Sequence, residues 1–264
     1  MTIEQLSVEN LREGIYCPRG LARSEEVYIQ LEAWLDGAFL RGQVARSDEG
    51  EPIGFILYCK LEDMPIEVDG SGLYMVQCLF VKPEFQDQGV GRALVEGAIS
   101  DALGCGAQGL AAEAHHKPPM DRLDYLAGSF YQHMGMTPGQ TRGTATLYFL
   151  GFGESACPPR YIDPRFQPPR DATRIRIDIL DCRRCYTAVR NRELVKEVAE
   201  SLGEGNVSVV VHDQNSRAAV LDKGMSSGVF IDGKLTFFQG PMTEEDIWSA
   251  IQTAASARKT HSDR

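Results

Sequence analysis

Residues 73–92 read LYMVQCLFVKPEFQDQGVGR, and this stretch decides the fold of the first half of the chain. Residues 73–81 are almost continuously apolar, which predicts a strand at the centre of a sheet rather than at its edge. Gly89 then opens a predicted helix that ends at Gly104. The loop between them is Gln86-Asp87-Gln88-Gly89-Val90-Gly91-Arg92. Such a loop directs backbone amides outward at the positive end of the helix dipole, and its glycines let a phosphate approach the main chain.

The segments around this stretch predict further alternating helices and strands. We expect a helix at 24–38, two strands joined by a turn at 48–50 within 42–60, a strand at 108–114, a helix at 123–134 and a strand at 145–152. Together with 73–104 they make a mixed α/β domain, which we place at residues 1–155.

A proline-rich segment separates this domain from a second one. Five of the chain's 13 prolines fall within 157–174, and because proline lacks the amide donor, we expect an extended linker at 156–172. The second domain is expected at 173–258, and 259–264 form a tail. Its predicted elements are a strand at 175–180, a helix at 185–202, a strand at 206–213, a hairpin at 228–240 that turns at Asp232-Gly233, and a helix at 243–255. This β-α-β-β-α order is that of a small thioredoxin-like unit.

Composition narrows the class of protein. The 264 residues are 43% hydrophobic and 24% charged, as expected for two globular domains, and the formal net charge of −10 argues against nucleic acid or an anionic membrane as partner. No apolar run approaches the length of a membrane span, and the N-terminus does not resemble a signal peptide. The seven cysteines are therefore expected to be reduced, in a cytoplasm.

Two motifs in order resemble the GNAT superfamily of acyltransferases. The first is the Q-x-x-G-x-G pattern of 86–91 between strand and helix, and the second is Phe130-Tyr131-Gln132-His133-Met134-Gly135-Met136, similar to F-Y-x-x-x-G-F with a methionine in place of the last aromatic. The resemblance covers residues 3–152. It implies an acyl-CoA N-acyltransferase fold that uses acetyl-CoA as co-substrate.

The resemblance also implies roles for particular residues. Leu79, Phe80 and Val81 would offer backbone groups to the pantetheine arm, and Gln86, Asp87, Gln88, Gly89, Val90, Gly91 and Arg92 would hold the pyrophosphate. Tyr131 would be the general acid for the departing thiolate; the alternative is a residue that only packs in the core. The general base is not assigned. The candidates are Glu113, the neighbouring His115 and His116, and a chain of water molecules. Cys78 is an acyl acceptor or, as is usual for a buried strand cysteine, inert packing.

The second domain contains Cys182-Arg183-Arg184-Cys185 directly after its first strand. A helix N-terminus and two arginines should depress the pKa of Cys182 and make it the more reactive thiol. The pattern resembles a thioredoxin-like redox site, although 226–230 (SSGVF) lacks the proline usual there. Three alternatives remain open for this pair. It carries out thiol redox chemistry, it holds a thiophilic metal or metalloid ion between Cys182 and Cys185, or it begins a helix without any chemistry.

The expected architecture is therefore α/β (α+β), a GNAT fold followed by a small thioredoxin-like domain. The second domain contains G-V-F-x-x-G-K at 228–234 and T-E-E-D-I at 243–247. Its pairing with the GNAT-like domain resembles a group of bacterial and archaeal acetyltransferases with a YoaP-type C-terminal domain. The resemblance implies an N-acetyltransferase acting on a small-molecule or peptide amine. The alternative is a non-catalytic acyl-CoA sensor coupled to a thiol redox or metal-binding domain. The sequence fixes neither the acceptor nor the oligomeric state.

Overall fold

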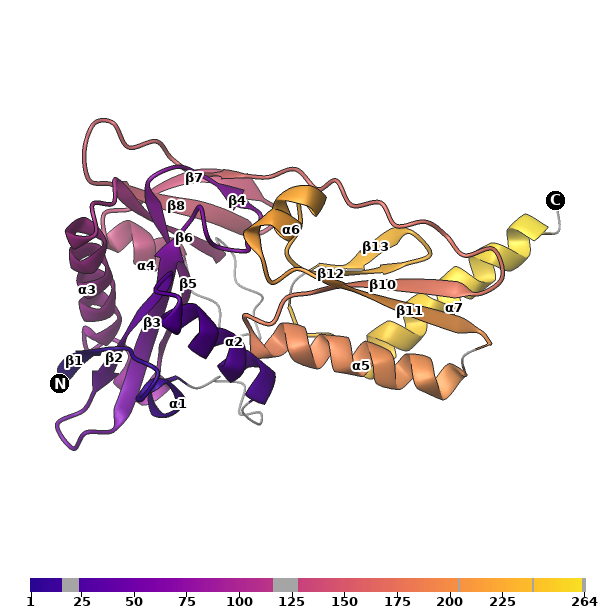
Figure 1. The fold of residues 1–264 in the computed structure, drawn as a ribbon, viewed down its shortest axis with the longest axis horizontal. Coiled ribbons are helices and arrows are strands. Elements are labelled where there is room, and N and C mark those ends of the chain that lie inside the picture. Colours follow the sequence, from indigo (N-terminus) through magenta and orange to yellow (C-terminus); the bar gives the residue numbers. More distant parts are fainter. Residues whose placement is uncertain (16–23, 116–127, 204, 239, 263–264) are drawn as a thin grey trace. The chain divides into compact units, whose positions relative to one another are not determined.

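The computed structural model describes residues 1–15, 24–115, 128–203, 205–238 and 240–262, which form two compact units (Figure 1). The first unit comprises Met1–Met64 and Val68–Tyr161, and the second comprises Pro65–Glu67 and Ile162–Arg264. Within the described parts, no helix is both long enough and apolar enough to cross a bilayer.

The first unit is built on a seven-stranded sheet. Its strands, in spatial order, are β1 (Thr2–Gln5), β2 (Leu40–Arg46), β3 (Pro52–Lys60), β5 (Leu73–Val81), β6 (Gly109–His115), β8 (Ala145–Gly151) and β7 (Thr137–Arg142). Every neighbouring pair is antiparallel except β5 and β6, which run parallel. The strand predicted at 73–81 is confirmed as β5 in the middle of the sheet. A separate short pair joins β4 (Val68–Asp69) to β9 (Arg160–Tyr161).

Helices cover both faces of this sheet. They are α1 (Leu11–Gly14), α2 (Glu25–Asp36), the 3-10 turn η1 (Pro83–Phe85), α3 (Val90–Gly104) and α4 (Gly128–His133). The apolar side of α3, with Leu94, Val95 and Ala98, packs in one core cluster with Tyr58 of β3 and Tyr131 of α4. Figure 1 shows α3 on one side of the sheet and α2 on the other.

The second unit contains a four-stranded sheet of order β11-β10-β12-β13. Its elements are β10 (Ile175–Asp181), α5 (Tyr186–Leu202), β11 (Val207–Asp213), α6 (Arg217–Lys223), β12 (Gly228–Ile231), β13 (Lys234–Phe237) and α7 (Glu244–Ser262). β10 is parallel to β11 and antiparallel to β12. The helices α5 and α7 share one core with the sheet, and Figure 1 shows α6 on the opposite side. The predicted hairpin is confirmed, because Asp232 and Gly233 both have positive φ (52° and 78°), as a tight turn with this twist requires.

The proline-rich segment is extended and packs against other parts of the chain. Arg160 and Tyr161 form β9 in the first unit. In the second unit, the amides of Arg165 and Phe166 both donate to the carbonyl of Lys223 (2.8 and 3.0 Å). The Phe166 ring lies edge-on to Phe230, with ring centroids 5.1 Å apart. The prolines supply no amide donors, so their non-proline neighbours make the hydrogen bonds.

Some elements were not predicted from the sequence. The strand β7 (TPGQTR) is polar and contains proline and glycine, so only its pairing with β8 makes it a strand. The helices α1 and α6 are too short for a periodic pattern. The last helix continues to Ser262, beyond the predicted end at 255. The helix predicted at 123–134 is described only as α4, because 116–127 lie outside the described residues.

Candidate functional site

The N-terminus of α3 presents free backbone amides in the first unit. Gly89 is the N-cap residue in the left-handed conformation (φ 82°), no side chain caps the helix, and its first turn contains no acidic residue. The first intrahelical bond runs from the amide of Ala93 to the carbonyl of Gly89 (3.0 Å). The amides before Ala93 therefore have no partner within the helix and point toward the positive end of its dipole, where an anion is favoured.

Neighbouring side chains hold the loop before this helix in place. The side-chain amide of Gln86 donates to the carbonyl of Val81 (3.1 Å), and the side-chain amide of Gln88 donates to the carbonyl of Glu84 (2.8 Å). A methyl group built on Gly89 meets no atom within 4 Å, so open space lies outside the loop at that point. Gly89 is required by its backbone conformation, and the open space leaves room for a phosphate.

The two parallel strands at the centre of the sheet separate beside this helix terminus. β5 and β6 pair only at Leu73–Met75 opposite Gly109–Ala111, so 76–81 and 112–115 do not pair with each other. A bulge in β5 accompanies the separation, because Cys78 lies opposite Leu57 whereas Val76 lies opposite Tyr58. The backbone of Leu79, Phe80 and Val81 pairs with β3, beyond the point where β5 and β6 stop pairing.

Tyr131 lies on α4 within the core that faces α3. Its side chain is 1% exposed and its ring stacks on Tyr148, with centroids 6.0 Å apart. Burial, reinforced by the nearby Cys78 thiol, raises the pKa of Tyr131 above its usual value. The phenol therefore stays protonated at neutral pH and is a weaker acid than an exposed tyrosine. Cys78 was expected to be a buried strand cysteine, but the structure places it in an exposed position.

Glu113 lies on the other face of the sheet from Tyr131. Ala112 and Ala114, its neighbours on β6, belong to the core cluster that includes Tyr131, and successive side chains of a strand alternate between faces. Glu113 itself is half-buried, opposite Leu147 of β8. His115 ends β6, and His116 lies outside the described residues. The structure thus leaves Tyr131 and Glu113 on different faces.

The two cysteines of the second unit differ in exposure. Cys182 is 1% exposed, and Cys185 is exposed at the N-cap of α5. The expectation of a depressed pKa at Cys182 is wrong. The helix begins at Tyr186 instead of Cys182, and burial raises the pKa of the Cys182 thiol despite the charge of Arg184 nearby. Cys185 is the residue at the helix terminus.

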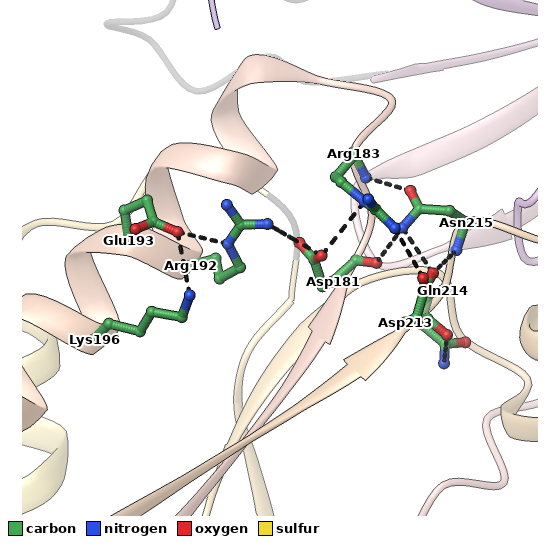
Figure 2. A network of polar contacts seen from close by, with 8 residues as sticks. All are labelled: Asp181, Arg183, Arg192, Glu193, Lys196, Asp213, Gln214 and Asn215. Atoms are coloured by element: carbon green, nitrogen blue, oxygen red, sulfur yellow. Dashed lines mark hydrogen bonds and ion pairs between the residues drawn. The ribbon is translucent and has the colours of Figure 1, made fainter. Parts of the chain in front are cut away.

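A buried ion pair lies beside these cysteines (Figure 2). Arg192 Nη1 donates to both carboxylate oxygens of Asp181 (3.1 Å each), and both side chains are less than a tenth exposed. On the other side of Asp181, the amide of Arg183 donates to Asn215 Oδ1 (2.6 Å), and Asn215 Nδ2 donates to the Asp181 carbonyl (3.2 Å). The end of β10 and the start of the cysteine loop are thereby fixed.

This ion pair was not predicted from the sequence, although the sequence contains a signal for it. Arg192 falls between Val189 and Val195, at helical spacing on the buried side of α5. A charged residue on an apolar helix face predicts a buried partner, because an unpaired buried charge is very unfavourable. Asp181, a carboxylate that ends an apolar strand, was the available candidate.

The predicted metal or metalloid site gains no support from the structure. Among the residues that the structure describes, no group of three or more histidine, cysteine, aspartate or glutamate side chains lies close enough together to hold an ion. Cys182 and Cys185 instead line one cavity of about 150 Å³ in the second unit.

Comparison with known proteins gives a family match for the first unit. Residues 8–122 match the Acetyltransferase (GNAT) family. A curated relative, the uncharacterised N-acetyltransferase YoaP of Bacillus subtilis (strain 168), is 24% identical over 135 residues, which are 50% of this chain and 52% of YoaP. The chain thus matches about half the length of this relative.

Two solved structures resemble the chain at a lower sequence identity than YoaP. The PaiA N-acetyltransferase of Thermoplasma acidophilum, in complex with coenzyme A, is 19% identical and has a TM-score of 0.43; the match covers 58% of this chain and all of the other. The GNAT family N-acetyltransferase YhbS of Escherichia coli, in complex with CoA, is 16% identical, with a TM-score of 0.42 and coverage of 61% and 88%.

Proposed function

We propose that this protein transfers an acetyl group from acetyl-CoA to a primary amine of a small molecule or peptide, because residues 8–122 match the Acetyltransferase (GNAT) family and a curated N-acetyltransferase is a relative. The observation that carries the proposal is the uncapped N-terminus of α3 beside the separation of β5 and β6. Gln86 to Arg92 would bind the pyrophosphate through backbone amides, and Leu79 to Val81 would bind the pantetheine arm where β5 no longer pairs with β6.

In this proposal Tyr131 is the general acid. The amine nitrogen attacks the thioester carbonyl, a tetrahedral oxyanion forms, and the carbon–sulfur bond breaks as CoA leaves with a proton. The position of Tyr131 supports the assignment, because its side chain shares a core cluster with Val76 and Leu79 of β5, the part of that strand that does not pair with β6.

The general base has weaker support. Glu113 is on the face of the sheet opposite Tyr131, so it would take a proton from the amine only if the acceptor enters from that face. A Glu113→Gln variant tests this assignment. Loss of acetylation that is recovered at higher pH, where more of the amine is already neutral, would support a base at this position.

The experiment that tests acetyl transfer is release of free thiol from acetyl-CoA in the presence of a panel of amines. An amine-dependent rate above the rate of hydrolysis supports the enzyme. Tight acetyl-CoA binding without thiol release for any amine would favour the alternative of a sensor. A Gly91→Glu variant is the matched control, because it should lose binding and thiol release together.

We propose a second function, thiol–disulfide exchange, for the second unit. In this proposal the unit is a thioredoxin-like dithiol domain. The sheet order β11-β10-β12-β13, with β10 parallel to β11, and a cysteine pair between β10 and α5 support it. Among the described residues, no group of three or more histidine, cysteine, aspartate or glutamate side chains could hold an ion. Formation of a Cys182–Cys185 disulfide on mild oxidation, and its reversal by dithiothreitol, tests this proposal.

A further inference from the structure

The cavity of about 150 Å³ in the second unit has both cysteines in its wall. It lies where α5 faces β12 and the segment after β13, and its apolar lining includes Ile179, Val229, Phe237 and Met242. Asn191 of α5 maintains one wall, because its amide donates to the Gly240 carbonyl (2.7 Å) and accepts from the Met242 amide (3.1 Å). A cavity of this volume holds a molecule about the size of benzene.

Cys185 is the accessible thiol of the pair. It is exposed, its backbone is extended (φ −142°, ψ 137°), and its carbonyl accepts the amide of Ala188 (3.1 Å) as the first bond of α5. No side chain caps the helix and no acidic residue lies in its first turn. The first amides of the helix therefore lie beside an accessible thiol.

Cys182 has the opposite surroundings. It is 1% exposed, and burial raises the pKa of its thiol. Each unit of increase lowers the thiolate fraction at neutral pH about tenfold. A buried thiol with a raised pKa reacts slowly with molecules from solution, but it remains beside Cys185 in the wall of the same cavity.

We propose that this cavity binds one half of a low-molecular-weight disulfide, that Cys185 is the attacking thiol, and that Cys182 resolves the mixed disulfide. The proposal rests on the dithiol function proposed above. In the first step the Cys185 thiolate forms a bond to one substrate sulfur, the substrate sulfur–sulfur bond breaks, and the other half leaves as a thiolate that takes up a proton.

The second step completes the exchange. Cys182 loses its proton and its sulfur attacks the Cys185 sulfur, so that the bond to the substrate half breaks and the second substrate thiol leaves. Two electrons pass from the two protein thiols to the substrate disulfide, and the protein is left with a Cys182–Cys185 disulfide. The order of the roles follows from exposure, since the residue that meets the substrate first must be the accessible one.

The test uses the reduced full-length protein and bis(2-hydroxyethyl) disulfide, a small neutral disulfide. Peptide mass mapping locates every adduct, because other cysteines of the chain are also exposed. In the wild type we expect a Cys182–Cys185 disulfide and two released thiols per chain. Cys182→Ser should stop at a mixed disulfide on Cys185, and Cys185→Ser should form no adduct at Cys182. Cys157→Ser, an exposed cysteine outside the cavity, is the matched control and should behave as the wild type.

Each of the other outcomes overturns one part of the proposal. A wild-type protein that forms no Cys182–Cys185 disulfide overturns the dithiol function itself. An adduct on Cys182 in the Cys185→Ser variant overturns the order of the roles and leaves the dithiol function intact. Faster reduction of insulin than of the small disulfide overturns the substrate class. Circular dichroism melting of each variant, with Cys182→Ala as a second substitution, separates loss of the thiol from loss of the fold.

Discussion

Arg192 of α5 donates from one guanidinium nitrogen to both carboxylate oxygens of Asp181, the last residue of β10, at 3.1 Å (Figure 2). The pair bridges the loop that contains both cysteines, since Asp181 comes directly before that loop and Arg192 lies in the helix that follows it. Arg192 also lines the cavity. The position of the cysteine loop therefore depends on this ion pair.

We expect Arg192→Met to destabilise the second unit by about 3 kcal/mol, because it leaves the Asp181 carboxylate buried without its main partner. Arg183, whose Nε lies 3.7 Å from Asp181, compensates part of the charge. Urea unfolding followed by tryptophan fluorescence measures the effect. In a Trp34→Phe background, the signal comes from Trp248 of the second unit alone. Adding Asp181→Leu should restore most of the stability. A cost below about 1 kcal/mol for the single variant would contradict a desolvated pair.

Gly91→Glu should abolish acetyl-CoA binding and leave the fold intact. The new carboxylate would lie in the first turn of α3, where it competes with the pyrophosphate for the same amides. Gly91→Ala is the steric control, since its Cβ would lie 3.4 Å from the Phe130 ring, a close but tolerable contact. Calorimetric titration with CoA measures the affinity of the Gly91→Glu and Gly91→Ala variants. Wild-type affinity in a folded Gly91→Glu protein would remove the proposed phosphate site.

Tyr131→Phe should lower kcat by roughly one to three powers of ten and change the affinity for acetyl-CoA little. The substitution keeps the ring that stacks on Tyr148 and deletes the hydroxyl alone. Steady-state kinetics with a reactive amine, together with thermal melting, separates chemistry from packing. An unchanged kcat would mean that Tyr131 is a core residue or that a step other than chemistry limits turnover.

Asp101 should make the first unit sensitive to acid. Burial alone would raise its pKa, but hydrogen bonds from Arg41 and Tyr58 outweigh burial and hold the pKa of Asp101 below its usual value. A carboxylate with a lower pKa in the folded state stabilises the fold above its unfolded pKa, about 3.9, and the stabilisation is lost as the pH falls through the folded value.

The variant Asp101→Asn should therefore lower the free energy of unfolding by about 1–2 kcal/mol at neutral pH, where the ion pair is present. Its difference from the wild type should shrink below about pH 4. Unfolding followed by Trp34 fluorescence in a Trp248→Phe background measures this, with the exposed Asp36→Asn as control. A difference that stays constant from pH 7 to pH 3 would contradict the lowered pKa.

Much of the fold could be predicted from local patterns. The apolar run 73–81 gave the central strand, Gly89 gave the start of α3, and Asp232-Gly233 gave the hairpin turn. These features depend on residues close together in the sequence. The strand β7 could not be predicted, because its polar residues become a strand only through pairing with β8.

The sequence by itself determined the residue types that carry the proposed chemistry: a glycine loop before a helix, a tyrosine in a second motif, and a cysteine pair after a strand. Only the tertiary structure decided their surroundings. It put Glu113 and Tyr131 on opposite faces of the sheet, exposed Cys78, and buried Cys182 while leaving Cys185 at the helix terminus. Spacing in a sequence fixes which residues are neighbours, but exposure and pKa depend on atoms brought from distant parts of the chain.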